Sequence, residues 1–293
     1  MGGLSLMRTL GLILAPLGVL LSLAAAASML GVGLLQLTGD ILPLSKVVSK
    51  LTLIFLLISI FPLRKLLRFS WQDLGFAPSA VFFRQIGQGL LLALLTLLPV
   101  LTTLYWLDVH VWDQGRVWTA SKVVEKTAMA LFLALLIAVG EEMLFRGLLL
   151  STFRRRLSAV LAICVSSLYY AALHFLKSKT QIPYAEQTFG SGFRLMGEAF
   201  GNWLNPEIFS AFLALFVVGV FLAVLRSRLP QSLGLCIGCH AGWVWQIKVS
   251  KDFFNVNPHA DYLYLVSNYD GVVGPLVAVW LTVALLIGLK VRP

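Results

Sequence analysis

Long uninterrupted apolar blocks constrain the fold of this chain more than any other feature of its sequence. A helix needs about 20 predominantly apolar residues to cross a hydrocarbon core about 30 Å thick. The apolar residues run continuously instead of alternating with polar ones, which predicts helices and argues against a barrel of strands. The expected spans are residues 10–37, 41–63, 86–106, 127–150, 157–175, 208–225, 233–249 and 272–289.

The composition is that of an integral membrane protein. Of the 293 residues, 59% are hydrophobic and 12% are charged, whereas a soluble domain is about 45 to 50% apolar and about 25% charged. We therefore expect an all-α, polytopic membrane helix bundle of about eight transmembrane helices that enclose an intramembrane polar cavity. Residues 1–293 are expected to form a single integral membrane domain, and the first apolar block is too long for a signal peptide.

The basic residues are distributed unevenly between the two sides of this expected bundle. With a cytoplasmic amino terminus, the inner loops hold twelve lysines and arginines against one acid, Asp73, and the outer segments hold ten of each sign. The positive-inside rule then predicts a multi-pass protein of a bacterial or archaeal cytoplasmic membrane, with both termini in the cytoplasm. The formal net charge of +10 reflects this topology. We expect membrane lipid as a partner and no nucleic acid.

Two connections between the expected spans are longer than the others. Residues 64–85 mix aromatic and basic side chains, and residues 176–207 are rich in Gly and Phe. Both are interpreted as ordinary interfacial connectors. The alternatives are that the first lies along the inner interface and that the second caps the bundle.

Three charged residues, Glu141, Glu142 and Arg146, interrupt the fourth block. A charge near the bilayer centre costs at least about 2.5 to 3.5 kcal/mol, so such residues usually face a bundle interior or a wet cavity and mark function. Glu142 and Arg146 are four residues apart and share a helix face, which predicts an ion pair. Glu141 points about 100° away. Without that partner, it is the candidate for proton transfer.

Two histidines on later spans are expected at a similar depth. His174 follows Tyr170 by four residues, and His240 lies in a block rich in Gly and Trp. At about 1.5 Å per residue, Glu141, His174 and His240 lie about 20, 24 and 18 Å from the inner ends of their helices. Three helices that carry ionisable groups to one depth favour a common site over separate helix-to-helix hydrogen bonds.

The chain thus carries three motifs in order: Glu-Glu-x-x-x-Arg, then an aromatic residue four positions before a His, then a His in a block rich in Gly and Trp. This set resembles the CPBP family of intramembrane endopeptidases, which includes the CAAX prenyl protease and bacteriocin-processing enzymes. The resemblance covers a core of about residues 127–250. It implies a hydrolase, a membrane-embedded glutamate-type peptidase that cleaves a membrane-associated protein or peptide. It also implies that Glu141 activates a water with help from His174, and that His240 stabilises the oxyanion. The residues with implied supporting roles are Glu142, Arg146 and Tyr170.

The chain departs from the family pattern at two positions. Tyr170 stands where Phe is usual, and Val244 stands four residues after His240, where the family often has Asn. A valine side chain cannot donate to an oxyanion. Gln246 is no replacement, because it points to the opposite side of a helix. A catalytically altered scaffold, or a transporter-like bundle that uses the same buried charges structurally, is therefore the alternative function.

No cofactor is expected, although two kinds of cofactor site have to be considered. Two Glu and two His can ligate zinc or iron, but the chain has no His-Glu-x-x-His pair and neither Glu is followed by His three residues later. We prefer a glutamate mechanism and leave a divalent metal such as zinc open. Residues 236–240 have the sequence Cys-x-x-Cys-His, which is the attachment motif of haem c. Because this string lies in an apolar block, we expect its cysteines to be buried core residues.

Overall fold

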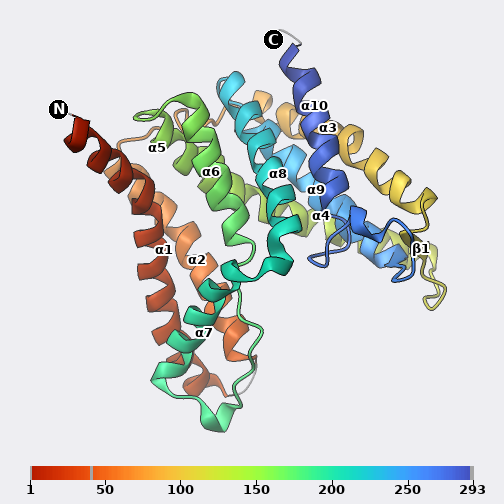
Figure 1. Ribbon diagram of the computed structural model, residues 1–293, viewed down its shortest axis with the longest axis horizontal. Coiled ribbons are helices and arrows are strands. Elements are labelled where there is room, and N and C mark those ends of the chain that lie inside the picture. Colours follow the sequence, from red (N-terminus) through yellow and green to blue (C-terminus); the bar gives the residue numbers. More distant parts are fainter. Residues whose placement is uncertain (1, 40–41, 291–293) are drawn as a thin grey trace.

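Each of the eight expected apolar spans falls largely on a helix in the computed structural model, which describes residues 2–39 and 42–290 (Figure 1). Ile41, at the start of the second expected span, and Asp40 and Arg292 of the charge count lie outside the described residues. The α-helices are α1 (Gly2–Thr38), α2 (Leu44–Leu66), α3 (Ser79–Trp106), α4 (Ala120–Glu142), α5 (Leu150–Arg154), α6 (Ala159–Leu173), α7 (Phe189–Gly201), α8 (Phe209–Arg228), α9 (Leu233–Phe253) and α10 (Pro275–Lys290).

Length and composition make this chain a polytopic helical membrane protein. α6 and α10 are apolar but have only 15 and 16 residues. α9 has 21 residues but is not among the candidate spans, since it carries polar side chains that face other helices rather than lipid. The exact number of eight crossings therefore stays a prediction. Among the described residues, five segments are long and apolar enough to cross a membrane: Leu6–Thr38, Leu44–Leu66, Ser79–Trp106, Ala120–Arg154 and Pro206–Arg228.

The two ends of the bundle are distinct. α1 begins and α10 ends on the same side, at the top of Figure 1, where α5 and the carboxyl end of α8 also lie. α7 lies toward the opposite end. An even number of crossings brings the first and last helices to one side in this way.

The connections differ from the sequence-based expectation. α2 continues to Leu66 and α3 begins at Ser79, so the first long connector is shorter than residues 64–85. Pro78 marks the start of α3, and Arg84 and Gln85 separate the first turn of this helix from its long apolar run. The second connector, expected as an ordinary one, contains α7, which starts at a Thr188–Ser191 capping box. Two three-residue strands, β1 (His110–Trp112) and β2 (Phe254–Val256), form an antiparallel pair that the all-α expectation omits.

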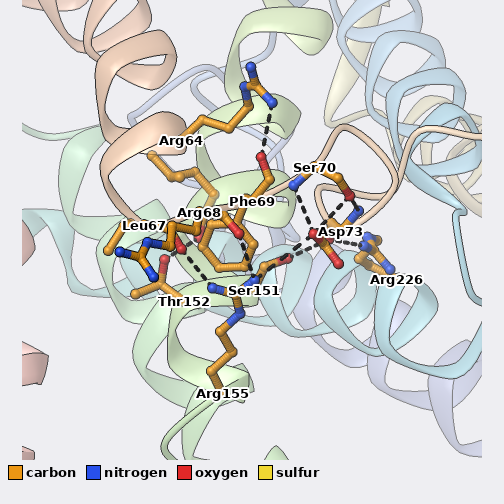
Figure 2. Close-up of polar contacts among 11 residues, drawn as sticks. Arg64, Leu67, Arg68, Phe69, Ser70, Asp73, Ser151, Thr152, Arg155 and Arg226 are labelled. Atoms are coloured by element: carbon orange, nitrogen blue, oxygen red, sulfur yellow. Dashed lines mark hydrogen bonds and ion pairs between the residues drawn. The ribbon is translucent and has the colours of Figure 1, made fainter.

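Arginines hold the connector between α2 and α3 to the rest of the bundle (Figure 2). The Arg155 guanidinium lies 3.5 Å from the centroid of the Phe69 ring, and Arg226 Nη2 donates to the Asp73 carbonyl at 3.1 Å. The backbone N–H and the hydroxyl of Ser70 both donate to Asp73 Oδ2 at 2.7 Å. These hydrogen bonds hold the pKa of Asp73 below its ordinary value. The connector is thus a fixed turn that ties α2 to α5 and α8.

Glycines bring α9 against α3 at backbone distance. Gly234, Gly238 and Gly242 recur every four residues along α9. A Cβ at Gly238 would collide with the carbonyl of Ile86, and a Cβ at Gly89 of α3 would collide with the α9 backbone. Small residues at this spacing let membrane helices pack closely. The packing fixes α9, and with it His240, against the rest of the bundle.

Candidate active site

The two adjacent glutamates end α4 and lead into a single π-helical segment, Met143–Leu149. The Glu142 side chain is 0% exposed and that of Arg146 is 2% exposed. Arg146 Nη1 donates to Glu142 Oε1 at 3.0 Å. The ion pair expected from the four-residue spacing is therefore present. Helical periodicity does not predict the π-helical segment, a feature that is often found at functional sites.

Glu142 also accepts a hydrogen bond from the third motif. His240 Nδ1 lies 2.8 Å from Glu142 Oε1, the same oxygen that Arg146 contacts. Because an ionised carboxylate only accepts, the proton of this bond is on Nδ1. A carboxylate bound in this way fixes both the tautomer and the orientation of an imidazole. The opposite ring atom, His240 Nε2, lies 3.9 Å from Glu141 Oε2.

His174 approaches the same carboxylate oxygen from the end of α6. Its Nδ1 donates to the Tyr170 carbonyl at 2.8 Å, since a carbonyl oxygen can only accept. Its Nε2 lies 3.9 Å from Glu141 Oε2. Within the described part of the chain, Glu141 Oε2 has no hydrogen-bond partner. Each 3.9 Å separation is too long for a direct hydrogen bond but short enough for one bridging water.

The Tyr170 ring lies at the centre of the cluster. The Arg146 guanidinium stands 4.3 Å from its centroid, a cation–π distance. The His174 ring meets Tyr170 edge-on at 4.6 Å, and the Phe145 ring does so at 5.1 Å. Tyr170 is buried. It therefore links the arginine of the first motif to the histidine of the second.

Two cavities meet at these side chains. The first, of about 240 Å³, is lined mainly by apolar side chains of α1, α2 and α7, and it contains Glu141 and His174. The second, of about 350 Å³, contains His174, Tyr170 and His240. His174 lines both cavities. The Glu141–histidine cluster therefore borders two cavities.

The position four residues after His240 does face the cluster. Val244 lines the same cavity as His240. An apolar side chain therefore occupies the position at which the family often has an Asn that could donate a hydrogen bond to an oxyanion. Gln246 is buried elsewhere, with Nε2 donating to the carbonyls of Ala93 and Gly242 at 3.0 Å each. The interpretation that Gln246 does not replace the missing donor agrees with these contacts.

The cysteines of the Cys-x-x-Cys-His string are core residues. Cys236 and Cys239 are fully buried free thiols. Cys236 Sγ donates to the Leu222 carbonyl of α8 at 3.6 Å. Across the described residues, no three His, Cys, Asp or Glu side chains are grouped so that they could hold a metal ion.

The segment that carries all three motifs matches a known family. Residues 123–246 match the family model of the Type II CAAX prenyl endopeptidase Rce1-like proteins. This segment, which is less than half of the chain, is similar to the Rce1-like family. The match confirms the resemblance to the CPBP endopeptidases.

The chain also has a relative in Bacillus subtilis (strain 168), described as "Uncharacterized protein YpbD". The two are 34% identical over 94 residues, which cover 31% of this chain and 44% of that protein. The match thus spans less than half of the relative's length. No solved structure matches the chain.

Sequence reasoning missed one part of this candidate site. It treated Glu142 and Arg146 as a pair on one helix and assigned His240 to the oxyanion alone. The contact between His240 and Glu142 joins residues 98 positions apart. The sequence contains no signal for it beyond the similar depth expected for the two helices.

Proposed function

We propose that this protein is an intramembrane endopeptidase that hydrolyses a peptide bond in a membrane-associated protein or peptide. The observation that carries the proposal is the placement of one carboxylate oxygen, Glu141 Oε2, 3.9 Å from the Nε2 atoms of both His174 and His240. The similarity of residues 123–246 to the Rce1-like family supports a hydrolase of this class.

In the proposed reaction, Glu141 acts as the general base. A water held between Glu141 Oε2 and His174 Nε2 gives a proton to Glu141 while its oxygen attacks the carbonyl carbon of the scissile bond. When the carbon–nitrogen bond breaks, Glu141 returns the proton to the leaving amine. Proton transfer by a positioned carboxylate contributes about 100- to 10,000-fold in rate. The low dielectric of the site strengthens these interactions.

His240 is proposed to stabilise the oxyanion. When it carries a proton on both nitrogens, its ring donates Nδ1–H to Glu142 and Nε2–H to the developing negative charge. The hydrogen bond at 2.8 Å already aims the ring, so little reorganisation is needed during the reaction. Glu142, Arg146 and Tyr170 act through His240 and His174 as positioning residues.

The proposed setting is a bacterial or archaeal cytoplasmic membrane. The excess of basic residues on the side where α1 begins and α10 ends supports cytoplasmic termini. Lipid surrounds the bundle. The substrate reaches the cavities from the membrane or from its surface.

A scaffold that has lost or altered catalysis is the second candidate function. The specific observation that favours it is Val244, which lines the His240 cavity without offering a donor. A scaffold would keep the Glu142–Arg146 pair, which stabilises the bundle, but would not need the alignment of both histidines on Glu141. That alignment is the reason to prefer the enzyme.

The test uses purified protein in detergent and two synthetic peptides that end in a CAAX sequence, one with an S-farnesyl cysteine and one without. Mass spectrometry of the products locates any cut. We expect the wild type to cleave at least one peptide and the Glu141→Ala protein to cleave neither. Undiminished cleavage by Glu141→Ala would refute the glutamate mechanism. Loss on chelation with recovery on adding zinc would assign the chemistry to a metal.

A further inference from the structure

Tyr170 carries a hydroxyl group that the packing of its ring does not require. The side chain is 2% exposed, and its ring contacts Phe145, Arg146 and His174. Within the described part of the chain, the hydroxyl forms no hydrogen bond. A buried polar group without a partner costs free energy, so each one in a native protein needs an explanation. A phenylalanine would make the same ring contacts and avoid this cost.

The Tyr170 hydroxyl faces the cavity that contains His240. Although the ring is enclosed, the hydroxyl oxygen keeps some accessible surface. Since Tyr170 lines this cavity, we place that surface there. The ring cannot easily turn away, because the Arg146 guanidinium lies 4.3 Å from its centroid and the His174 ring lies 4.6 Å from it. A donor that is fixed in this way needs little reorganisation when charge develops beside it.

The other uncharged donors in the wall of this cavity are engaged or lie farther from His174. The Trp243 indole N–H donates to the Thr96 hydroxyl at 2.8 Å, and that hydroxyl donates to a carbonyl of its own helix at 2.7 Å. Tyr269 lies in the connector between β2 and α10, and its ring centroid is 6.5 Å from that of His174, compared with 4.6 Å for Tyr170. Tyr170 therefore offers the hydroxyl closest to the histidine that faces Glu141 among the described lining residues.

Positions 170 and 244 contribute to one cavity from two helices. Tyr170 lies one turn before His174 on α6, and Val244 lies one turn after His240 on α9. Both side chains line the cavity that contains His240, and the Tyr170 and His240 ring centroids are 6.1 Å apart. A valine side chain cannot donate a hydrogen bond, whereas a tyrosine hydroxyl can. The two departures from the family pattern thus remove a donor from one wall of the cavity and add one to another.

We infer that the Tyr170 hydroxyl is a catalytic donor, which binds the oxyanion in place of a donor at position 244. The inference rests on the proposed endopeptidase function. When the water oxygen adds to the carbonyl carbon, an electron pair of the C=O bond moves to the oxygen, and the Tyr170 O–H and the His240 Nε2–H both donate to it. When the carbon–nitrogen bond breaks, that pair re-forms the double bond. Tyr170 keeps its proton throughout, and its ring keeps its positioning role.

The experiment is a double-mutant cycle on positions 170 and 244, with kcat and KM measured for the farnesylated and the unmodified CAAX peptide. We expect Tyr170→Phe to lower kcat by about 100-fold, the effect of removing one oxyanion donor, with KM nearly unchanged. Adding Val244→Asn to Tyr170→Phe should restore kcat to about the wild-type value. This gain should exceed the gain from Val244→Asn alone, because a second donor to one oxyanion adds less than the first. Equal gains in the two backgrounds would overturn the inference.

Two controls separate the Tyr170 hydroxyl from general effects on the cavity. Tyr269→Phe removes a hydroxyl from the same cavity wall and should leave kcat nearly unchanged. The unfolding midpoint of Tyr170→Phe should match that of the wild type, because the hydroxyl has no partner among the described residues and the ring stays in place. A wild-type kcat in Tyr170→Phe would overturn the inference, as would equal losses of kcat in Tyr170→Phe and Tyr269→Phe.

A binding measurement separates failure of this inference from failure of the proposed function. A phosphinate in place of the scissile bond gives the CAAX peptide a tetrahedral oxyanion that cannot be cut. Calorimetry in the presence of a chelator gives its dissociation constants for the wild type and for Tyr170→Phe. If the wild type cuts no peptide but binds the phosphinate about tenfold more tightly than Tyr170→Phe does, the donor role stands and the proposed function fails. If both proteins cut the peptide and bind the phosphinate equally, the proposed function stands and the donor role fails.

Discussion

We expect the same substitution to alanine to destabilise the protein strongly at Glu142 and only slightly at Glu141. Glu142 accepts two hydrogen bonds, from Arg146 at 3.0 Å and from His240 at 2.8 Å. Both donors are nearly inaccessible, with side chains 2% and 4% exposed. A hydrogen bond to a charged group contributes about 1.5 to 3 kcal/mol, and breaking a buried ion pair costs about 3 to 5 kcal/mol. Glu142→Ala should therefore lower the free energy of unfolding by about 3 to 5 kcal/mol.

Glu141→Ala is the matched control for this prediction. The Glu141 side chain is 23% exposed, and its nearest charged partners are imidazoles at 3.9 Å. An ion pair that is not well buried contributes about 0 to 1 kcal/mol, so we expect Glu141→Ala to change the free energy of unfolding by less than about 1 kcal/mol.

The assay follows the unfolding of detergent-solubilised protein with denaturant by tryptophan fluorescence. Glu142→Gln, which keeps an acceptor for His240 but not the charge, should fall between Glu142→Ala and the wild type. Equal losses in Glu141→Ala and Glu142→Ala would refute the reasoning. So would a loss below about 1 kcal/mol in Glu142→Ala, because the buried Glu142 carboxylate would then not stabilise the packing of α4 against α9.

Three further predictions test other parts of the structure. Gly89→Ala puts a Cβ against the α9 backbone and should destabilise the protein by at least about 1 to 3 kcal/mol in the same assay, whereas Gly87→Ala, where a Cβ meets open space, should not. Val244→Asn adds a donor to the His240 cavity and should raise kcat for the peptides at least about tenfold, whereas Val244→Leu should not. Because hydrogen bonds from Ser70 lower the pKa of Asp73, its stabilising contribution is present above about pH 4 and is lost as the pH falls through the folded-state pKa. The difference in melting temperature between wild type and Asp73→Asn should accordingly shrink below about pH 4, and no such shrinkage would contradict the role of that turn.

The helices could be predicted from the sequence because apolar runs of membrane-spanning length permit few other structures. Boundaries and short elements could not. In α3, Arg84 and Gln85 interrupt the apolar run, so the expected span begins only at residue 86, although Pro78 marks the start of the helix. α7 is too short to produce a membrane-length run, so it was hidden within residues 176–207.

The residues of the candidate site could be predicted from the sequence, but most of the contacts between them could not. The four-residue spacing of Glu142 and Arg146 is local, so helix geometry predicts their contact. The contact of Glu142 with His240 depends on how closely α9 approaches α4, which the sequence does not specify. The orientation of each Nε2 depends on what its Nδ1 contacts, a Glu142 oxygen for His240 and a backbone carbonyl for His174.

The measurement that tests the central claim most directly is the single-turnover rate of peptide cleavage by Glu141→Gln protein, compared with wild type, in the presence of a chelator. Glutamine has the size of glutamate but cannot accept the proton of the attacking water. We expect the rate to fall by about 100- to 10,000-fold, with the unfolding midpoint unchanged and with no effect of the chelator on the wild type. Cleavage by Glu141→Gln at the wild-type rate would contradict the claim that this carboxylate activates the water.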